Sequence, residues 1–337
     1  MCIENIVTIC IVISLIIFLI IMIINNNNKY SQESFDNSFT KNDYDILIRY
    51  LDFFEKKTNN IVDIKKVYKE KLGNVPIYVI NLPKSIKRYN NIIKQISKYG
   101  LENVNIIEAV NGRKINTINS DVIHFELNNN YIKYVKYSDH VEKKEEIGCT
   151  LSHLNCMKIF YDSFKNHHDY YFRQNNYVLI CEDDVSFMFI PYVKSIKEIV
   201  NNAPTDWEII SLYGWCYGNT GNNKYINHSN ADCVMAAAYL INLNGCKKVL
   251  DYLYDKNKNM YILRPSINNK SRNYILADYL SMDICNSYLY KDPIIVPIND
   301  YGTLNSTIHE NHTDLQLANA LVNIKSIYNN HVLNLHQ

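Results

Sequence analysis

An apolar run that ends abruptly in three carboxylates, Tyr177-Val-Leu-Ile-Cys-Glu-Asp-Asp184, constrains the fold of this chain more than any other segment. The residues from Val178 to Cys181 show no polar alternation, which predicts a strand buried on both faces of an open α/β sheet. Ligands of such sheets bind at the carboxyl ends of the strands. The acidic triplet stands at that end, so it predicts either a ligand site or a solvated acidic turn.

The order of the three carboxylates suggests which way their side chains point. Side chains alternate between the two faces of an extended chain, so Glu182 and Asp184 are expected on one side and Asp183 on the other. Two converging carboxylates supply the hard oxygen ligands that Mg²⁺ and Mn²⁺ prefer. A divalent metal site at Glu182 and Asp184 is therefore one prediction, and an acidic turn is the alternative.

Strands and helices alternate on both sides of this segment. Strands are predicted at residues 75–82, 104–110, 207–212 and 234–241, and helices at 84–99, 148–164, 192–200 and 244–253. Elements of these lengths in this order predict an α/β fold with a mostly parallel sheet flanked by helices.

The N-terminus carries a separate signal. Residues 6–24 carry no charge, and all of them except Thr8 and Ser14 are apolar. As a helix they are long enough to cross roughly 30 Å of hydrocarbon. The run ends in four asparagines instead of small residues, which favours a transmembrane anchor over a cleaved signal peptide. A single-pass membrane protein is expected, with its folded domain on the luminal or extracytoplasmic side.

Four parts of the chain follow from these signals. They are an anchor at 1–28, a polar stem at 29–74 with an amphipathic stretch at 44–68, a folded domain at 75–310, and a C-terminal tail or helix at 311–337.

Composition excludes some partners. The 35 Lys and Arg residues nearly balance the 34 Asp and Glu residues, which argues against nucleic acid as a partner, because phosphate binding needs a basic surface. The nine cysteines form no CxxC pair or His/Cys cluster, so their spacing signals neither a zinc site nor a dense disulfide framework.

Five segments follow one another along the chain: Ile77–Leu82 with Lys87 and Arg88, Glu108–Gly112, Gly148–Leu154, Glu182–Asp184, and Ala238–Ile241 before Gly245. In this order they resemble glycosyltransferase family 25, which includes lipopolysaccharide-biosynthesis glycosyltransferases and procollagen galactosyltransferases. The similarity covers roughly residues 75–307. Two positions depart from the family pattern: Pro83 stands where an acidic residue is usual, and Asn111 replaces an aspartate.

The resemblance implies a GT-A-type, Rossmann-like fold and inverting transfer of a hexose, galactose or glucose, from a UDP-sugar. The acceptor would be a hydroxyl on a glycan, a lipid-linked sugar or a protein hydroxylysine. Mn²⁺ or Mg²⁺, held by Glu182 and Asp184, would neutralise the diphosphate leaving group. Asp278 is implied as the base that deprotonates the acceptor, with Asp283 in reserve. Either aspartate could instead have a structural role, as a helix cap or as an ion-pair partner on a surface helix.

Three residues are expected at the nucleotide. Asn81 lies in the first motif of the resemblance, and Asp183 is the ribose or ligand-orienting member of the triplet. Arg88 follows the first strand, where a guanidinium can clamp phosphate, or it is a solvated helix residue.

Further polar residues complete the expected site. Ser152 and His153 follow Gly148 near a predicted helix N-terminus, which suits an anionic donor, although His153 is equally compatible with a structural role. His309, near the end of the domain, is a candidate third metal ligand.

Two rival functions stay open at this point. A metal-dependent hydrolase or nuclease could also use Glu182 and Asp184, but it would need a further ligand cluster or a basic groove. A catalytically inactive, glycan-binding or structural member of the same fold is the other alternative.

Overall fold

The computed structural model describes residues 41–119, 122–124, 135–136, 144–166, 176–217, 223–230, 232–234, 236–264, 275–297 and 313–334. They all belong to one compact unit, residues 41–337. The predicted anchor, residues 1–28, lies outside the described residues, as does His309. Within the described ranges, no helix has both the length and the apolar character needed to cross a membrane.

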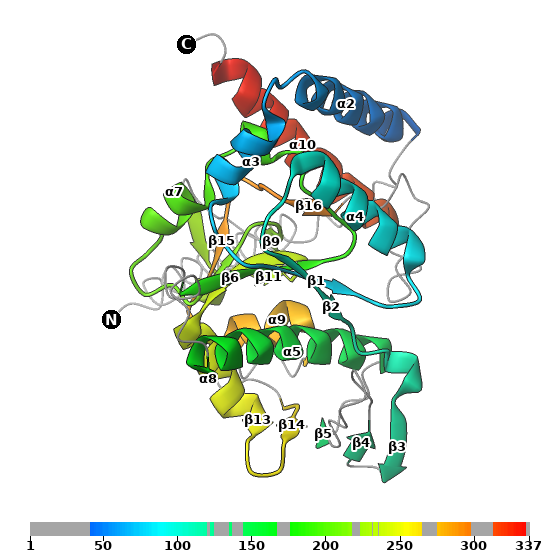
Figure 1. Cartoon of the computed structure of the whole chain (residues 1–337), viewed down its shortest axis with the longest axis vertical. Coiled ribbons are helices and arrows are strands. Elements are labelled where there is room, and N and C mark those ends of the chain that lie inside the picture. The colour runs from blue at the N-terminus through cyan, green and yellow to red at the C-terminus, as the bar shows by residue number, and fades with distance from the viewer. Residues whose placement is uncertain are drawn as a thin grey trace, which may run out of the picture. The chain divides into compact units, whose positions relative to one another are not determined.

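A seven-stranded sheet with the order β10-β15-β8-β12-β6-β1-β2 forms the centre of the described fold (Figure 1). Five strands run in one direction, whereas β10 and β12 run against them. The mostly parallel α/β sheet predicted from the sequence is thus confirmed. The strands are β1 (Ile77–Asn81), β2 (Val104–Glu108), β6 (Tyr177–Glu182), β8 (Ile209–Ser211), β10 (Tyr225–Asn227), β12 (Ala238–Asn242) and β15 (Ser287–Tyr290).

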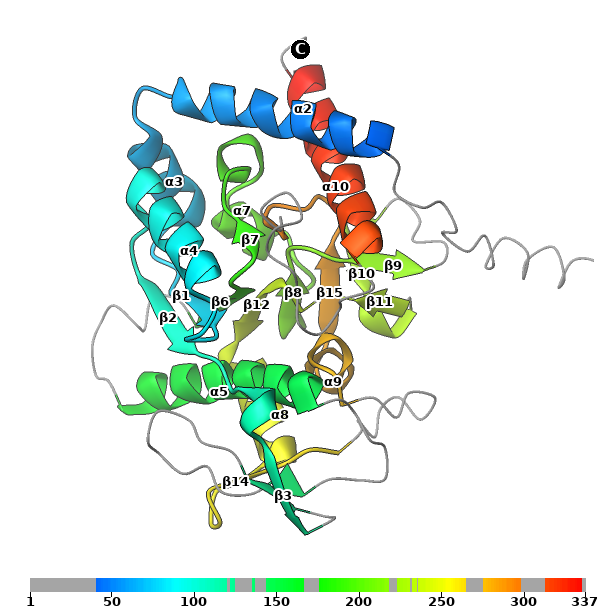
Figure 2. The same cartoon turned by 90° about the vertical axis from the view of Figure 1, so that its right-hand side faces the viewer.

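Helices cover both faces of this sheet (Figures 1 and 2). One face carries α5 (Lys144–Asn166), α8 (Leu243–Leu253) and α9 (Ala277–Ile284). The opposite face carries α3 (Ile64–Leu72), α4 (Ile86–Tyr99) and α7 (Ile196–Asn201). Beyond them, α2 (Lys41–Asn59) packs against α10 (Thr313–Asn334).

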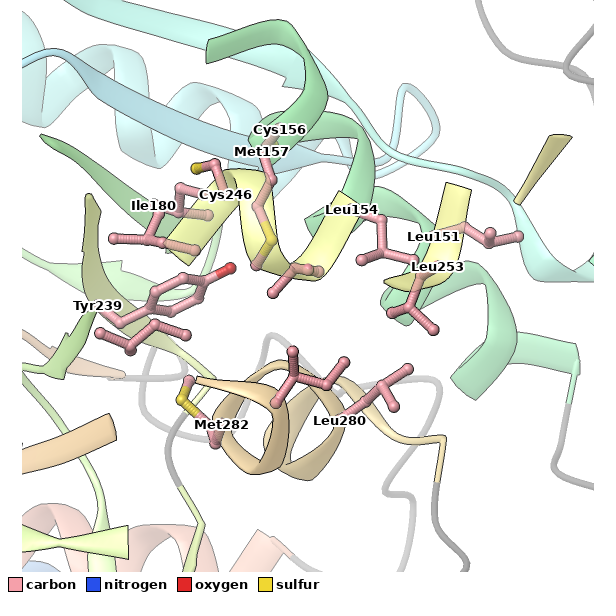
Figure 3. Packing of buried hydrophobic residues seen from close by; sticks show 14 of the residues in the cluster. Leu151, Leu154, Cys156, Met157, Ile180, Tyr239, Cys246, Leu253, Leu280 and Met282 are labelled. Carbon is pink, nitrogen blue, oxygen red and sulfur yellow. The ribbon is translucent and has the colours of Figure 1, made fainter. Parts of the chain in front are cut away.

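The core lies between the sheet and the helices that cover its α5 face. Met157 of α5, Ile180 of β6, Tyr239 of β12 and Met282 of α9 surround one interior space (Figure 3). Each is at most 1% exposed. Burying such a side chain contributes about 1.5–3 kcal/mol, so this layer fixes how α5 lies against the end of β6.

Two glycines let the chain after β2 cross closely over α5. A Cβ on Gly112 would lie 2.1 Å from the carbonyl oxygen of Lys144. A Cβ on Gly148 would lie 2.7 Å from both the Gly112 amide nitrogen and the Val110 carbonyl oxygen. No other residue fits at such distances, because the obstacles are backbone atoms. The loop after β2 is therefore fixed against the helix that carries part of the candidate site.

The described part of the predicted stem is folded onto this unit. In α2, Leu47, Leu51 and Phe54 are buried. In α3, the Tyr68 hydroxyl donates to the Phe187 carbonyl oxygen over 2.9 Å. The amphipathic pattern at 44–68 thus marks helices that pack against the rest of the unit.

Several element boundaries differ from the sequence predictions; for example, the helix predicted at 192–200 is α7, which begins only at Ile196. The helix predicted at 148–164 begins four residues earlier, at Lys144. The strand predicted at 234–241 divides into β11 (Asp232–Val234), which pairs with β9 (Trp215–Tyr217), and β12 in the central sheet.

The described cysteines fall into two groups. Cys233, on β11, is disulfide-bonded and lies opposite Cys216 in the β9–β11 ladder. Five other cysteines are free thiols: Cys149 is half-buried, and Cys156, Cys181, Cys246 and Cys285 are buried.

Candidate active site

The acidic triplet forms a turn at the carboxyl end of β6. The strand ends at Glu182, and Asp183 and Asp184 form the turn that leads into β7 (Val185–Ser186). The expectation of an extended triplet is therefore wrong, because the turn replaces strand alternation. The three carboxylates still lie close together, since the charge of Glu182 contributes to raising the pKa of both aspartates.

Asp183 is held by two donors from neighbouring elements. Asn81, the last residue of β1, donates to its Oδ2 over 2.6 Å, and Arg88 of α4 donates to its Oδ1 over 2.8 Å. Burial nevertheless raises the pKa of Asp183, although both partners favour the charged form. Arg88 is therefore not a solvated helix residue, as one reading of the sequence allowed.

The Asp184 carboxylate has fewer polar partners than that of Asp183. Its Oδ2 lies 3.7 Å from Nη2 of Arg88, whereas its Oδ1 is buried and has no hydrogen-bond partner among the described residues. Burial, and then the charge of Glu182, raises the pKa of Asp184 to about 7. A buried carboxylate oxygen without a donor is unusual and costly. Its surroundings suit a bound cation.

Glu182 faces α5. Its Oε1 lies 3.5 Å from Nε2 of His153 and accepts from the Cys149 thiol over 3.7 Å. The other ring nitrogen of His153, Nδ1, lies 3.0 Å from the Tyr239 hydroxyl. His153 is 3% exposed, so its imidazole is fixed between two polar partners.

Asp278 stands in the first turn of α9, close to this group. Its Oδ1 accepts from the Ala236 amide over 2.9 Å. Its negative charge helps to raise the pKa of both the Cys149 thiol and the Tyr213 phenol, after burial as the main cause. Both of those groups also feel the charge of Asp184. The structure thus brings Asp278 near the acidic turn.

Ser152 has a different environment from the one predicted. Its hydroxyl donates to the Gly148 carbonyl over 2.6 Å and accepts from the Val110 amide over 2.8 Å. Because α5 begins at Lys144, Ser152 lies inside the helix instead of at its N-terminus. The helix-terminus argument for an anion at Ser152 and His153 is therefore wrong, and the described contacts of Ser152 bind α5 to the loop after β2.

Asp283, the reserve base, is engaged with a histidine. Nε2 of His228 lies 2.9 Å from its Oδ1, and both side chains are 3% exposed. A carboxylate so buried presents little surface to an acceptor, which leaves Asp278 as the stronger candidate.

A pocket of about 290 Å³ adjoins the acidic turn through Asn81. Its walls are mainly apolar, and two of them, Ile86 and Tyr89, are 64% and 41% exposed. The pocket is therefore open to solvent next to the Asn81–Asp183 contact. Its lining residues are Asn81, Pro83, Ile86, Tyr89, Ile106 and Glu108.

Sequence reasoning did not single out Cys149 or Tyr239. A signal existed for Cys149, because it precedes His153 by four residues and such pairs share a helix face. Tyr239 reaches the site through the antiparallel pairing of β12 with β6, in which it lies opposite Ile180. No local pattern reveals that pairing.

Comparison with known proteins adds independent information. Residues 74–227 match the sequence model of glycosyltransferase family 25 (LPS biosynthesis protein). The chain is 29% identical over 153 residues to procollagen galactosyltransferase 2 of Homo sapiens, covering 45% of this chain and 22% of that protein. It is 28% identical over 201 residues to a glycosyltransferase 25 family member of Aedes aegypti, covering 56% of this chain and 30% of that protein. The matched part thus spans less than a third of each relative.

The matched residues contain Asn81, Arg88, His153 and the acidic turn, whereas Asp278 lies beyond them. The match covers four of the five ordered motifs, since Ala238–Ile241 lies beyond residue 227, and it agrees with the α/β fold on which they lie. Residues 74–227 of this chain belong to glycosyltransferase family 25.

Proposed function

We propose that this chain is a metal-dependent, inverting hexosyltransferase that moves galactose or glucose from a UDP-sugar to an acceptor hydroxyl. The family match supports glycosyl transfer. The relative named procollagen galactosyltransferase 2 supports galactose as the sugar and a protein as the acceptor. The family description, LPS biosynthesis protein, supports a glycan or lipid-linked acceptor as the alternative.

The buried, unpartnered Oδ1 of Asp184 carries the metal part of this proposal. A divalent cation there would supply the missing electrostatic partner and relieve the repulsion between Asp184 and Glu182. The residues thus fit a hard cation, with Asp184 and Glu182 as its ligands. When bound, Mn²⁺ or Mg²⁺ would neutralise charge on the diphosphate leaving group.

The nucleoside is assigned to the pocket beside Asn81. Tyr89 offers an aromatic face for a base, and Asp183 lies next to it at the Asn81 contact, where its carboxylate can accept from ribose hydroxyls. Arg88 lies between both aspartates and is within reach of a phosphate brought to the turn. A GT-A-type arrangement, with the donor at the carboxyl ends of β1 and β6, follows from this assignment.

Asp278 is assigned as the base that takes the acceptor's proton. The amide of Ala236 orients its carboxylate, and the side chain is partly exposed, as contact with an acceptor requires. The proton moves from the acceptor hydroxyl to this carboxylate while the acceptor oxygen attacks the anomeric carbon and the UDP oxygen leaves.

The membrane expectation also becomes a proposal. We infer that residues 1–28 anchor the chain and that the folded unit faces a luminal or extracytoplasmic space. The disulfide at Cys233 supports an oxidising compartment, because such bonds are rare in reducing ones.

Nucleotide release from UDP-galactose and UDP-glucose by the full chain in mild detergent tests the transferase proposal. We expect release with Mn²⁺ or Mg²⁺ and none with a chelator. Asp278→Asn should lower the rate about 10²–10⁴-fold without weakening donor binding. Asp251→Asn, an exposed acid on α8, is the control and should leave the rate unchanged.

Two results would contradict the proposal. Failure to turn over any nucleotide sugar with any divalent ion would leave an inactive, glycan-binding member of the family. Full activity in the presence of the chelator would show that transfer does not depend on a metal ion.

A further inference from the structure

Three metal-ligating atoms of different chemical kinds converge where α5 meets the end of β6. Cys149 and His153 lie four residues apart on one face of the helix, and Glu182 points at that face. Sγ of Cys149 lies 3.7 Å and Nε2 of His153 lies 3.5 Å from the same Glu182 oxygen. All three atoms lie within 4.8 Å of one another.

The two contacts to Glu182 agree with the edges of a tetrahedral zinc site. Zinc bonds measure about 2.3 Å to sulfur, about 2.0–2.1 Å to imidazole nitrogen and about 2.0–2.2 Å to carboxylate oxygen. A tetrahedron with those bonds has edges of about 3.4–3.6 Å. The two contacts to Glu182 lie within about 0.1 Å of that range, and the sulfur–nitrogen separation is within 4.8 Å, so an ion requires at most a further approach of the two helix ligands.

The contact between His153 and Tyr239 supports the same conclusion independently. Metal-bound histidines usually have their second ring nitrogen held by a hydrogen bond, which fixes the ring and its tautomer. Nδ1 of His153 has such a partner in the Tyr239 hydroxyl at 3.0 Å. In the tautomer in which Nδ1 donates to this oxygen, Nε2 presents its lone pair toward Glu182.

The site is also accessible. The His153 side chain is 3% exposed, but that of Glu182 is 30% exposed, so the side of Glu182 leads to solvent. Catalytic zinc sites have this form, with three protein ligands and one open position.

We propose that Cys149, His153 and Glu182 bind Zn²⁺ in an open, three-ligand site. Thiolate and imidazole favour zinc over Mg²⁺ and Mn²⁺, whereas the carboxylates of Glu182 and Asp184 favour the harder ions. Glu182 belongs to both sets, so zinc withdraws it from the hard-cation site. Zinc displaces the thiol proton of Cys149, which passes to solvent.

Cobalt(II) is the probe for this site, because it absorbs light in tetrahedral sites and shows a sulfur-to-metal charge-transfer band when thiolate is bound. The metal-free full chain should develop this band up to one equivalent of Co²⁺ and lose it when Zn²⁺ is added. Cys149→Ala should abolish the band, and His153→Gln should weaken binding at least about 10-fold.

Cys156→Ala is the matched control, because it removes a second free thiol, which is buried, from the same helix. It should leave the band unchanged. Glu182→Gln keeps both ligands on the helix and should bind Co²⁺ more weakly. This variant tests the three-ligand site even if Cys149→Ala fails to fold.

Absence of the band from the full chain, or its persistence in folded Cys149→Ala, would overturn the proposal. The four side chains would then be a hydrogen-bonded network that needs no ion. The readout is independent of sugar transfer. A chain that binds zinc but turns over no donor would refute only the proposed function, and an active chain without the band would refute only the zinc site.

Discussion

Replacing Asp184 by asparagine is expected to abolish sugar transfer and, at the same time, to stabilise the metal-free protein. In the folded chain, burial and the charge of Glu182 raise the pKa of Asp184 from 3.8 to about 7. The unfolded chain therefore releases this proton at lower pH than the folded chain. Above pH 3.8, ionisation of Asp184 favours unfolding.

The size of the effect follows from the pKa difference. Between pH 3.8 and 7 the penalty grows by about 1.4 kcal/mol per pH unit. It reaches about 4 kcal/mol near pH 7 and stays constant above it. Asparagine has almost the same shape and no charge, so the Asp184→Asn variant escapes the penalty. Its melting temperature should exceed that of the natural chain by roughly 5–10 °C at pH 8.

Thermal unfolding of the natural chain and of Asp184→Asn, measured with chelator at pH 4.5 and pH 8, tests this reasoning. The gap between the two should be small at pH 4.5 and large at pH 8. Adding Mn²⁺ should then stabilise the natural chain, by about 2.7 kcal/mol at a hundred times its dissociation constant. The variant should not respond.

Asp183→Asn is the matched control: removing its buried charge also relieves a penalty, but a lost hydrogen bond should offset that gain, so it should be stabilised less than Asp184→Asn. Its carboxylate accepts from Asn81 and Arg88 on separate oxygens, so an amide group would turn a donor toward one of these donors. That mismatch should cost about 1–3 kcal/mol. If Asp184→Asn is no more stable than the natural chain at pH 8, the buried charge is not the destabilising feature that we describe.

Three further predictions concern the fold and its anchor. Gly148→Ala should destabilise the protein by more than about 2 kcal/mol, because its Cβ would meet backbone atoms. Gly73→Ala would meet no atom within 4 Å and should cost about 1–3 kcal/mol for its backbone conformation alone, with φ 66° and ψ −146°. A smaller loss of stability in Gly148→Ala than in Gly73→Ala would contradict the close crossing. Tyr68→Phe leaves the buried carbonyl of Phe187 without its donor and should lower the unfolding free energy by about 1–3 kcal/mol in urea titrations, and an unchanged midpoint would show that α3 is not tightly docked. The full chain should remain with membranes after washing in alkaline carbonate, and its release into the supernatant would contradict the predicted anchor.

Part of the fold could be predicted because some strands are buried on both faces. The unbroken apolar runs of β1 and β6 identified them, and the polar residues that end each run placed Asn81 and the acidic turn correctly. The same pattern did not show that the chain turns after Glu182, because a turn of two aspartates and an extended pair look alike in sequence. The start of α5 was missed for a similar reason, since the polar residues before Gly148 carry no apolar periodicity.

Contacts between distant segments were beyond sequence reasoning. The amphipathic pattern at 44–68 indicated an apolar helix face but not what covers it, so helices that pack on the unit were interpreted as a spacer. In the candidate site, Arg88 was expected to meet phosphate, yet its bonds to both aspartates depend on how α4 lies over β6. Tyr239 approaches His153 only because β12 runs antiparallel between β6 and β8.

The glycine crossing has a consequence for how donor choice can evolve. Gly112 and Gly148 bring the backbone after β2 close to α5, so this backbone joins the strand that supplies Ile106 and Glu108 of the pocket to the helix that carries His153. A substitution that tilts α5 and so moves the His153 imidazole would also change the shape of the pocket wall. A change in the pocket wall and a change in the surroundings of the ion would therefore act on the same stretch of backbone.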